Sequence, residues 1–204
     1  MMSIEGLDTH LLLLINNGLA NSSLDAVMIS LSNRGFLLFL PYLFYMLIRG
    51  WSGRADADAS LFKVAFLTVL ISICSFVIAD ALADMLKPVI GRVRPCQAVP
   101  GLRLPVRCPH SFSMPSGHAI SSFAAATTLF YLPRYFVPTL ARWYPLVLAA
   151  TVALSRVYLG VHYPSDVIVG AALGSTVALL FSLLYERLLP GQLRQSSHLG
   201  KRSF

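Results

Sequence analysis

The chain has 204 residues, of which 56% are hydrophobic and only 12% are charged. Soluble domains carry about 25% charged residues, so the composition argues against an ordinary soluble domain and is typical of a membrane protein. The formal net charge of +7 suits an anionic partner, and since no basic helix or basic–aromatic repeat is present, we expect lipid or phosphate and no nucleic acid.

The first predicted element is an N-terminal helix, and five apolar segments follow it. Residues 3–19 alternate apolar and polar positions, which favours a helix in the membrane interface; no basic segment typical of a secretory signal peptide precedes it. The apolar segments each approach the roughly 20 residues that cross a bilayer. They cover 24–49, 61–84, 117–132, 143–160 and 165–188.

We therefore predict an all-α polytopic membrane helix bundle with five transmembrane helices, or six if residues 3–19 also cross. Residues 1–190 are expected to form a single domain, and 191–204 a polar, disordered tail. The side of the membrane that receives 50–60, 133–142 and the chain from Glu186 onward carries nine Lys and Arg at or near these parts, against seven on the other side. Several of the seven lie in the polar motifs below; when these are discounted, the positive-inside rule places the first side in the cytoplasm.

The loop over residues 85–116 then faces outward. Cys96 and Cys108 lie in this loop, where they form a disulfide if the compartment is oxidising or remain free thiols. Cys74 lies in an apolar segment, and we expect it to be inert.

The first polar motif follows the second apolar segment and reads K-P-V-I-G-R-V-R-P, from Lys87 to Pro95. A proline disfavours the helical conformation of the residue before it, so Pro88 predicts that the chain leaves the helix at Lys87. Arg92 and Arg94 follow, which gives a group of three cations. Such a group either binds a phosphate or contacts lipid headgroups at the membrane surface.

The second motif, P-S-G-H, runs from Pro115 to His118 at the start of the third segment. We expect Ser116 to cap the helix, and Gly117 to let an anion approach the backbone closely. The first N–H groups of a helix are free to bind an anion, and His118 lies beside them. The alternative is a plain helix cap with an interfacial histidine.

The third motif reads S-R-V-Y-L-G-V-H-Y-P-S-D, from Ser155 to Asp166, and joins the last two segments. Arg156 ends the fourth segment, and Pro164 fits the first turn of the fifth helix. His162 and Asp166 are four residues apart, a spacing that brings them side by side. The carboxylate can then fix the imidazole tautomer and leave the other nitrogen as a nucleophile; a membrane-surface salt bridge is the alternative.

All three motifs fall on the same side of the membrane, where ionisable groups at helix ends indicate a functional site. Arginines bind phosphate in a bidentate manner, and phosphoryl transfer depends on positioning and charge stabilisation. A metal-dependent phosphatase needs a carboxylate cluster. Only Asp166 is firmly placed at this site, so we expect no metal and no cofactor. Asp80 and Asp84 are expected to pair with nearby cations.

The order and spacing of the motifs resemble the signature of the type 2 phosphatidic acid phosphatase superfamily, in its integral-membrane lipid phosphatase branch. The matching residues are Lys87-x6-Arg94-Pro95, Pro115-Ser116-Gly117-His118 and Ser155-Arg156-x5-His162-x3-Asp166. The resemblance implies that His162 attacks phosphorus and becomes a phosphohistidine, and that Asp166 orients it. It implies that His118 protonates the leaving oxygen and then activates water. The implied phosphate-binding residues are Lys87, Arg94, Ser116, Gly117 and Arg156.

The resemblance also implies a lipid phosphate or diphosphate as substrate, in a bacterial inner membrane with the site facing the periplasm or exterior. Undecaprenyl diphosphate is the leading choice; phosphatidylglycerophosphate, phosphatidic acid and lipid A phosphates are alternatives. Three rival functions differ in class. They are a lipid phosphotransferase, a vanadate-dependent oxidant, which the apolar segments disfavour, and a non-catalytic lipid carrier, which the two histidines disfavour.

Overall fold

The computed structural model describes residues 4–51 and 55–188, and the regular elements within these ranges are all helices. The predicted all-α class is therefore confirmed for this part of the chain. The extent of the domain and the tail over 191–204 stay predictions, because the tail lies outside the described residues. The elements are α1 (Ile4–Asn16), α2 (Ser22–Arg34), η1 (Gly35–Phe39), α3 (Leu40–Gly50), α4 (Ala55–Ile90), α5 (Pro95–Ala98), α6 (Gly117–Tyr131), η2 (Leu132–Tyr135), α7 (Thr139–Tyr158) and α8 (Pro164–Leu188).

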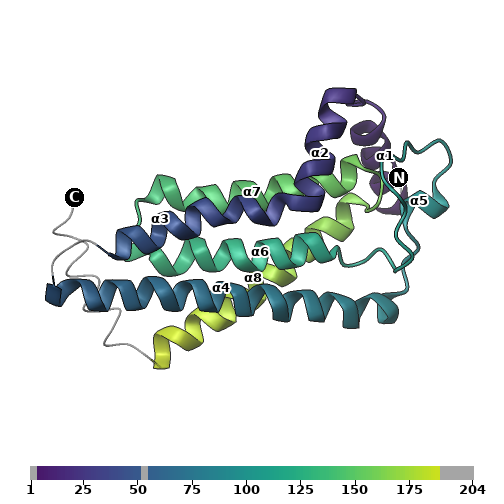
Figure 1. The fold of residues 1–204 in the computed structure, drawn as a ribbon. Coiled ribbons are helices and arrows are strands. Elements are labelled where there is room, and N and C mark those ends of the chain that lie inside the picture. Colours follow the sequence, from purple (N-terminus) through teal and green to yellow (C-terminus); the bar gives the residue numbers. More distant parts are fainter. Residues whose placement is uncertain (1–3, 52–54, 189–204) are drawn as a thin grey trace.

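Three helical stretches are long and apolar enough to cross a membrane, namely Ser22–Gly50, Leu61–Ala98 and Pro164–Leu188. They contain the first, second and fifth predicted segments. Helices α6 and α7 form where the third and fourth segments were predicted and run alongside the others (Figure 1). The total of five or six crossings stays a prediction. Large apolar side chains on the outer faces, such as Phe44, Val77 and Leu180, are exposed, as expected for a surface that lipid covers.

Helix α6 is the central helix of the bundle and packs against α4, α7 and α8. The closest of these contacts is made by small residues at every fourth position of α8, which are all buried: Gly170, Gly174, Ala178 and Ser182. A Cβ atom on Gly174 would lie 2.0 Å from the carbonyl oxygen of Ile120 in α6. Small residues allow this approach of two membrane helices, and it brings the start of α8 against the start of α6.

Helix α1 lies at the end of the bundle where α5 and the loop over 99–114 are found (Figure 1). Its Leu12 is buried with Val157 and Tyr163. The Asn16 side chain donates hydrogen bonds to the backbone oxygens of Arg103, at 2.9 Å, and of Tyr158, at 2.7 Å. The N-terminal helix is therefore tied to the polar end of the bundle; its place in the membrane interface stays a prediction.

The chain does not leave the helix at Lys87, so that prediction is wrong. Pro88 lies inside α4, which continues to Ile90. The helix ends where Gly91 takes a positive φ of 64° and its N–H donates to the Lys87 carbonyl at 2.9 Å. Glycine adopts this left-handed conformation without steric cost, so it sets the end of the helix more strongly than the proline does.

Candidate active site

The eight predicted site residues come from elements that end or begin at one end of the bundle (Figure 1). Lys87 lies in the last turn of α4, and Arg94 immediately precedes α5. Ser116, Gly117 and His118 open α6. Arg156 lies in the last turn of α7, His162 in the connection that follows, and Asp166 in the first turn of α8.

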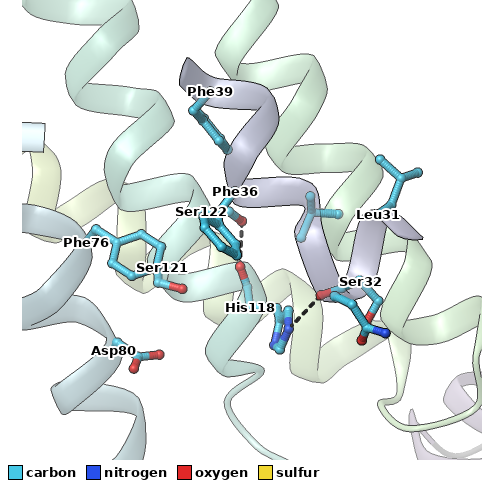
Figure 2. Close-up of a pocket in the computed structure, with 11 residues that line it drawn as sticks. Leu31, Ser32, Phe36, Phe39, Phe76, Asp80, His118, Ser121 and Ser122 are labelled. Atoms are coloured by element: carbon cyan, nitrogen blue, oxygen red, sulfur yellow. Dashed lines mark hydrogen bonds between the residues drawn. The ribbon is translucent and has the colours of Figure 1, made fainter. Parts of the chain in front are cut away.

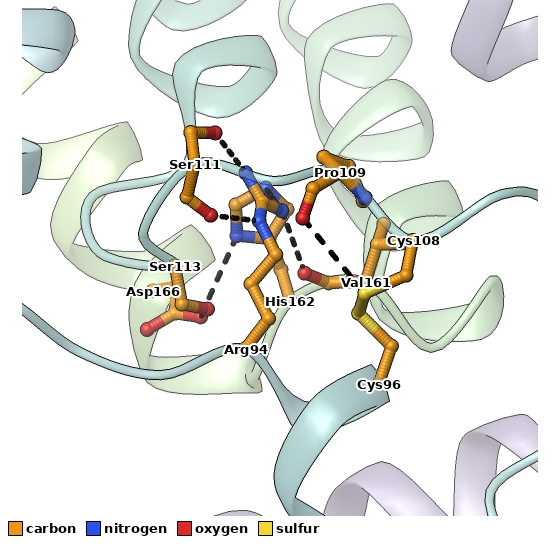
Figure 3. The surroundings of a disulfide bond; sticks show 9 residues. All are labelled: Arg94, Cys96, Cys108, Pro109, Ser111, Ser113, Val161, His162 and Asp166. Atoms are coloured by element: carbon orange, nitrogen blue, oxygen red, sulfur yellow. Dashed lines mark hydrogen bonds and ion pairs between the residues drawn. A yellow bond between two sulfur atoms is a disulfide. The ribbon is translucent and has the colours of Figure 1, made fainter.

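His162 lies between Arg94 and Asp166 (Figure 3). Its Nε2 is 3.0 Å from Nη1 of Arg94, and its Nδ1 is 3.5 Å from Oδ2 of Asp166. Because a guanidinium only donates hydrogen bonds, Nε2 must be the accepting nitrogen, and the ring proton is then on Nδ1. The 3.5 Å separation is long for a hydrogen bond, as is common at catalytic groups without substrate. The tautomer is the one expected of a nucleophile that attacks through Nε2.

The His162 ring is 2% exposed. Burial, together with the positive charges of Arg94 and Arg156, lowers its pKa to about 4 in spite of the opposing effect of Asp166. The imidazole is therefore neutral at physiological pH, and the lone pair of its Nε2 accepts from Arg94.

The Asp166 carboxylate is fully buried and is held by several donors. Its Oδ2 accepts from the Ser113 hydroxyl and from the Tyr163 N–H, the latter at 2.8 Å. Its Oδ1 accepts from Nη1 of Arg92 at 2.6 Å. The carboxylate can therefore orient His162 without freedom to turn away. Nothing in the sequence pattern had indicated Ser113.

Arg92, whose role the motif left open, joins this site to helix α1. Its Nη2 lies 2.5 Å from Oδ2 of Asp8, and Nη1 also donates to Ser165 Oγ at 2.6 Å. The guanidinium stacks 4.0 Å from the Tyr163 ring centre. Asp8 in turn accepts from the Ser165 N–H at 2.9 Å. Arg92 thus bridges two buried carboxylates, those of Asp8 and Asp166.

Two polar groups, one before the start of α6 and one in the last turn of α7, are left without partners. The Ser116 hydroxyl and the Nε of Arg156 are buried and have no hydrogen-bond partner among the described residues. Ser116 occupies the N-cap position, but its hydroxyl makes no cap hydrogen bond, so the prediction that it caps α6 is wrong for the side chain. The hydroxyl and the first N–H groups of α6 are therefore available to an anion.

His118 has its Nε2 3.1 Å from the backbone oxygen of Ser32 (Figure 2). The Ser32 hydroxyl in turn contacts Arg156. Ser32 therefore touches both a predicted acid–base residue and a predicted phosphate-binding residue. In the sequence, Ser32 is marked only as a serine within an apolar segment, so its part in the site could not be predicted.

A cavity of about 230 Å³ opens beside His118 between η1, α4 and α6 (Figure 2). Phe36, Phe39 and Phe76 line its apolar part, and Asp80 lies at its polar end. Phe36 is exposed on the outer face of the bundle, whereas Phe39 is buried, so the apolar part of the cavity reaches that outer face.

The predicted pairing of Asp80 and Asp84 with cations is correct for Asp84 only. Nζ of Lys87 lies 2.7 Å from Oδ1 of Asp84. Asp80 makes no hydrogen bond or ion pair with the part of the chain that the structure describes. Within these same ranges, no group of three or more His, Cys, Asp or Glu side chains is arranged to hold a metal ion.

Cys96 and Cys108 form a disulfide with a Cα–Cα distance of 6.0 Å, which decides between the two alternatives that the sequence left open. The bond lies next to Arg94 (Figure 3). Nε of Arg94 donates at 2.6 Å to the carbonyl of Ser111, which follows Cys108 by three residues, so the segment after the disulfide helps to hold the arginine.

These features define a class: a membrane helix bundle with buried arginines and two histidines at one end. The chain belongs to the PAP2 superfamily, whose family profile matches residues 65–189. It is 42% identical over 100 residues to the decaprenylphosphoryl-5-phosphoribose phosphatase of Mycobacterium tuberculosis, a match that covers 49% of this chain and 51% of that protein. It is 40% identical over 110 residues to the undecaprenyl-diphosphatase of Sulfolobus acidocaldarius, covering 53% and 50%.

The chain thus spans about half the length of these curated relatives. The fold is similar to the crystal structure of a transmembrane PAP2-type phosphatidylglycerolphosphate phosphatase from Bacillus subtilis, with a TM-score of 0.66 and 24% identity, covering 92% of this chain and 89% of that one. At this identity the likeness concerns the fold alone.

Proposed function

We propose that the protein is an integral-membrane lipid phosphatase that works without a metal ion, through a phosphohistidine on His162. The observation that carries the proposal is the buried His162 ring, whose Nε2 lies 3.0 Å from Nη1 of Arg94 while its Nδ1 faces Asp166. Unpartnered donors on Ser116 and Arg156 lie in the same set of helix ends. A nucleophile surrounded by donors and cations is suited to a phosphoryl group with charged oxygens.

In the first step, Nε2 of His162 forms a bond to phosphorus, and the bond from phosphorus to the lipid oxygen breaks. His118 gives its proton to that oxygen. The positive charge that develops on the His162 ring is stabilised by Asp166. In the second step, His118 takes a proton from water, the water oxygen bonds to phosphorus, and the P–N bond breaks to release inorganic phosphate. The phosphate oxygens are held throughout by Lys87, Arg94, Ser116, Gly117 and Arg156.

The proposed substrates are phosphorylated membrane lipids, because the cavity beside His118 is apolar on its membrane side. Both relatives named above act, by their names, on polyprenyl-linked phosphates. This favours a polyprenyl lipid over phosphatidylglycerophosphate, phosphatidic acid or lipid A; undecaprenyl diphosphate was the leading choice from the sequence. The proposed location is a bacterial inner membrane with the site facing outward, where the Cys96–Cys108 disulfide is stable.

The test is phosphate release by purified protein in detergent micelles from a panel of polyprenyl, diacyl and lipid A phosphates. We expect release from at least one lipid, and none with His162→Ala of unchanged circular dichroism. A rate that His162→Ala leaves near that of the wild type would reject the mechanism. Transfer of the phosphoryl group to an added alcohol, without free phosphate, would indicate the phosphotransferase instead.

A further inference from the structure

We infer that Asp80 determines specificity: it selects phosphomonoesters whose leaving alcohol carries hydrogen-bond donors, and it selects against lipid diphosphates. The inference rests on the proposed function, and it argues against undecaprenyl diphosphate as the main substrate. It starts from a carboxylate that the predicted chemistry does not use.

Asp80 and Lys87 lie seven residues apart on α4, a spacing that puts both on one face of a helix. That face meets the start of α6. A Cβ atom built on Gly117 would lie 3.5 Å from Nζ of Lys87 and 3.6 Å from Oδ1 of Asp80. The phosphate-binding lysine and the Asp80 carboxylate therefore stand beside the same glycine, at the border between the phosphate site and the cavity.

Asp80 is exposed and makes no hydrogen bond or ion pair with a described residue, so its carboxylate is open to a ligand. Lys87 is paired with Asp84 one turn away, at 2.7 Å. The hydroxyls of Ser121 and Ser122, which line the same cavity, donate to the backbone oxygens of Gly117 and His118 in their own helix. They are therefore not available to donate to the carboxylate. An ionisable side chain on a membrane helix is costly to keep unless it has a function.

The position of Asp80 relative to His118 tells which part of the substrate it meets. His118 protonates the leaving oxygen, so the leaving group lies on the His118 side of the phosphorus atom. Asp80 and His118 line the same cavity, and the Asp80 carboxylate lies at its polar end below Phe76 (Figure 2). The leaving group therefore comes next to the carboxylate.

A phosphate and a hydroxylated alcohol, as leaving groups, interact with the Asp80 carboxylate in opposite ways. When a diphosphate is cleaved, the leaving group is itself a phosphate, and its negative charge is brought against Asp80; like charges placed together in this way reduce binding by at least about tenfold. A leaving alcohol with hydroxyl groups can donate a hydrogen bond to the same carboxylate. A charged acceptor strengthens that bond, so the glycerol or sugar part of a headgroup is favoured.

The experiment compares lipids that share a tail. We would measure kcat/KM for undecaprenyl phosphate and undecaprenyl diphosphate, and for phosphatidic acid, diacylglycerol diphosphate and phosphatidylglycerophosphate. For each variant, the kcat/KM of one lipid is divided by that of another. When this ratio is compared between variants, intrinsic differences in leaving-group reactivity cancel. We expect Asp80→Asn to raise the ratio of diphosphate to monophosphate about tenfold or more. Asp80→Ala should in addition lower the ratio of phosphatidylglycerophosphate to phosphatidic acid, because it removes the acceptor.

Asp84→Asn is the matched control, since it removes the same charge one turn away, from a side chain that is 69% exposed. It should leave the substrate ratios within about twofold, because Asp84 does not line the cavity beside His118. If Asp80→Asn also leaves the ratio within twofold while the wild type turns over both lipids, the inference is wrong. If the wild type hydrolyses no lipid of either series, the proposed function itself fails, and the inference fails with it.

Discussion

Replacing Arg92 by methionine should destabilise the fold strongly, because this one guanidinium separates two buried carboxylates. Asp8 is 5% exposed and Asp166 is fully buried, and Arg92 contacts them at 2.5 and 2.6 Å. Removing one partner from a buried ion pair costs about 3–5 kcal/mol. Both carboxylates keep other donors, from Ser113 and Tyr163 on one side and Ser165 on the other. We therefore expect a loss near the lower end, about 3 kcal/mol.

The assay is reversible unfolding in mixed micelles with increasing SDS, followed by circular dichroism. Arg107→Met, an exposed arginine in the neighbouring loop, should change the free energy of unfolding by no more than about 0.5 kcal/mol. The double variant Arg92→Met with Asp8→Asn leaves a single buried carboxylate, so it should recover at least about 1 kcal/mol relative to the additive value. A loss below about 1 kcal/mol for Arg92→Met, or additive behaviour of the double variant, would refute this reading of the contacts.

Three further outcomes can be measured independently. Since the pKa of His162 is lowered to about 4 from an ordinary value near 6.5, the ring stays neutral until the pH falls to about 4, and stability decreases as the pH falls from about 6.5 towards 4; a ¹⁵N NMR titration of the ring with a midpoint near 6.5 would contradict this. Gly174→Ala should destabilise the protein by about 1–3 kcal/mol, because its Cβ would lie 2.0 Å from the Ile120 oxygen; an unchanged SDS unfolding midpoint would show that α6 and α8 do not approach so closely. Reduction of Cys96–Cys108, which closes a loop of sequence separation 12, should lower stability by roughly 3 kcal/mol, and a midpoint insensitive to reductant would exclude that contribution.

The helical fold and the eight site residues could be predicted because their signals are local. Hydropathy over some 20 residues marks a membrane helix, and the motif spacing around Arg94, His118 and His162 is short enough to read directly. Their grouping at one end of the bundle followed from the alternation of segments across the membrane. The pairing of α6 with α8 left a weaker signal, the small residues at Gly170 and Gly174, whose partner helix the sequence does not name.

The contacts that complete the site come from distant parts of the chain, so no local pattern shows them. Asp8 reaches Arg92 across 84 residues, and Ser113 reaches Asp166 across 53. Ser32 meets His118 from 86 residues away. Each is a single polar residue whose role exists only once the helices have packed. The prediction that the chain leaves the helix at Lys87 was wrong for a local reason, because Gly91 rather than Pro88 ends α4.

The measurement that tests the central claim most directly is the site of phosphorylation during turnover. The protein would be mixed with a ³²P-labelled lipid substrate, quenched in alkali, where phosphohistidine survives, and digested for mass spectrometry. The account predicts a transient phosphoryl group on the peptide that contains His162, and no label on the same peptide of the His162→Ala variant. Steady release of phosphate with no label on that peptide, or label on a different residue, would contradict it.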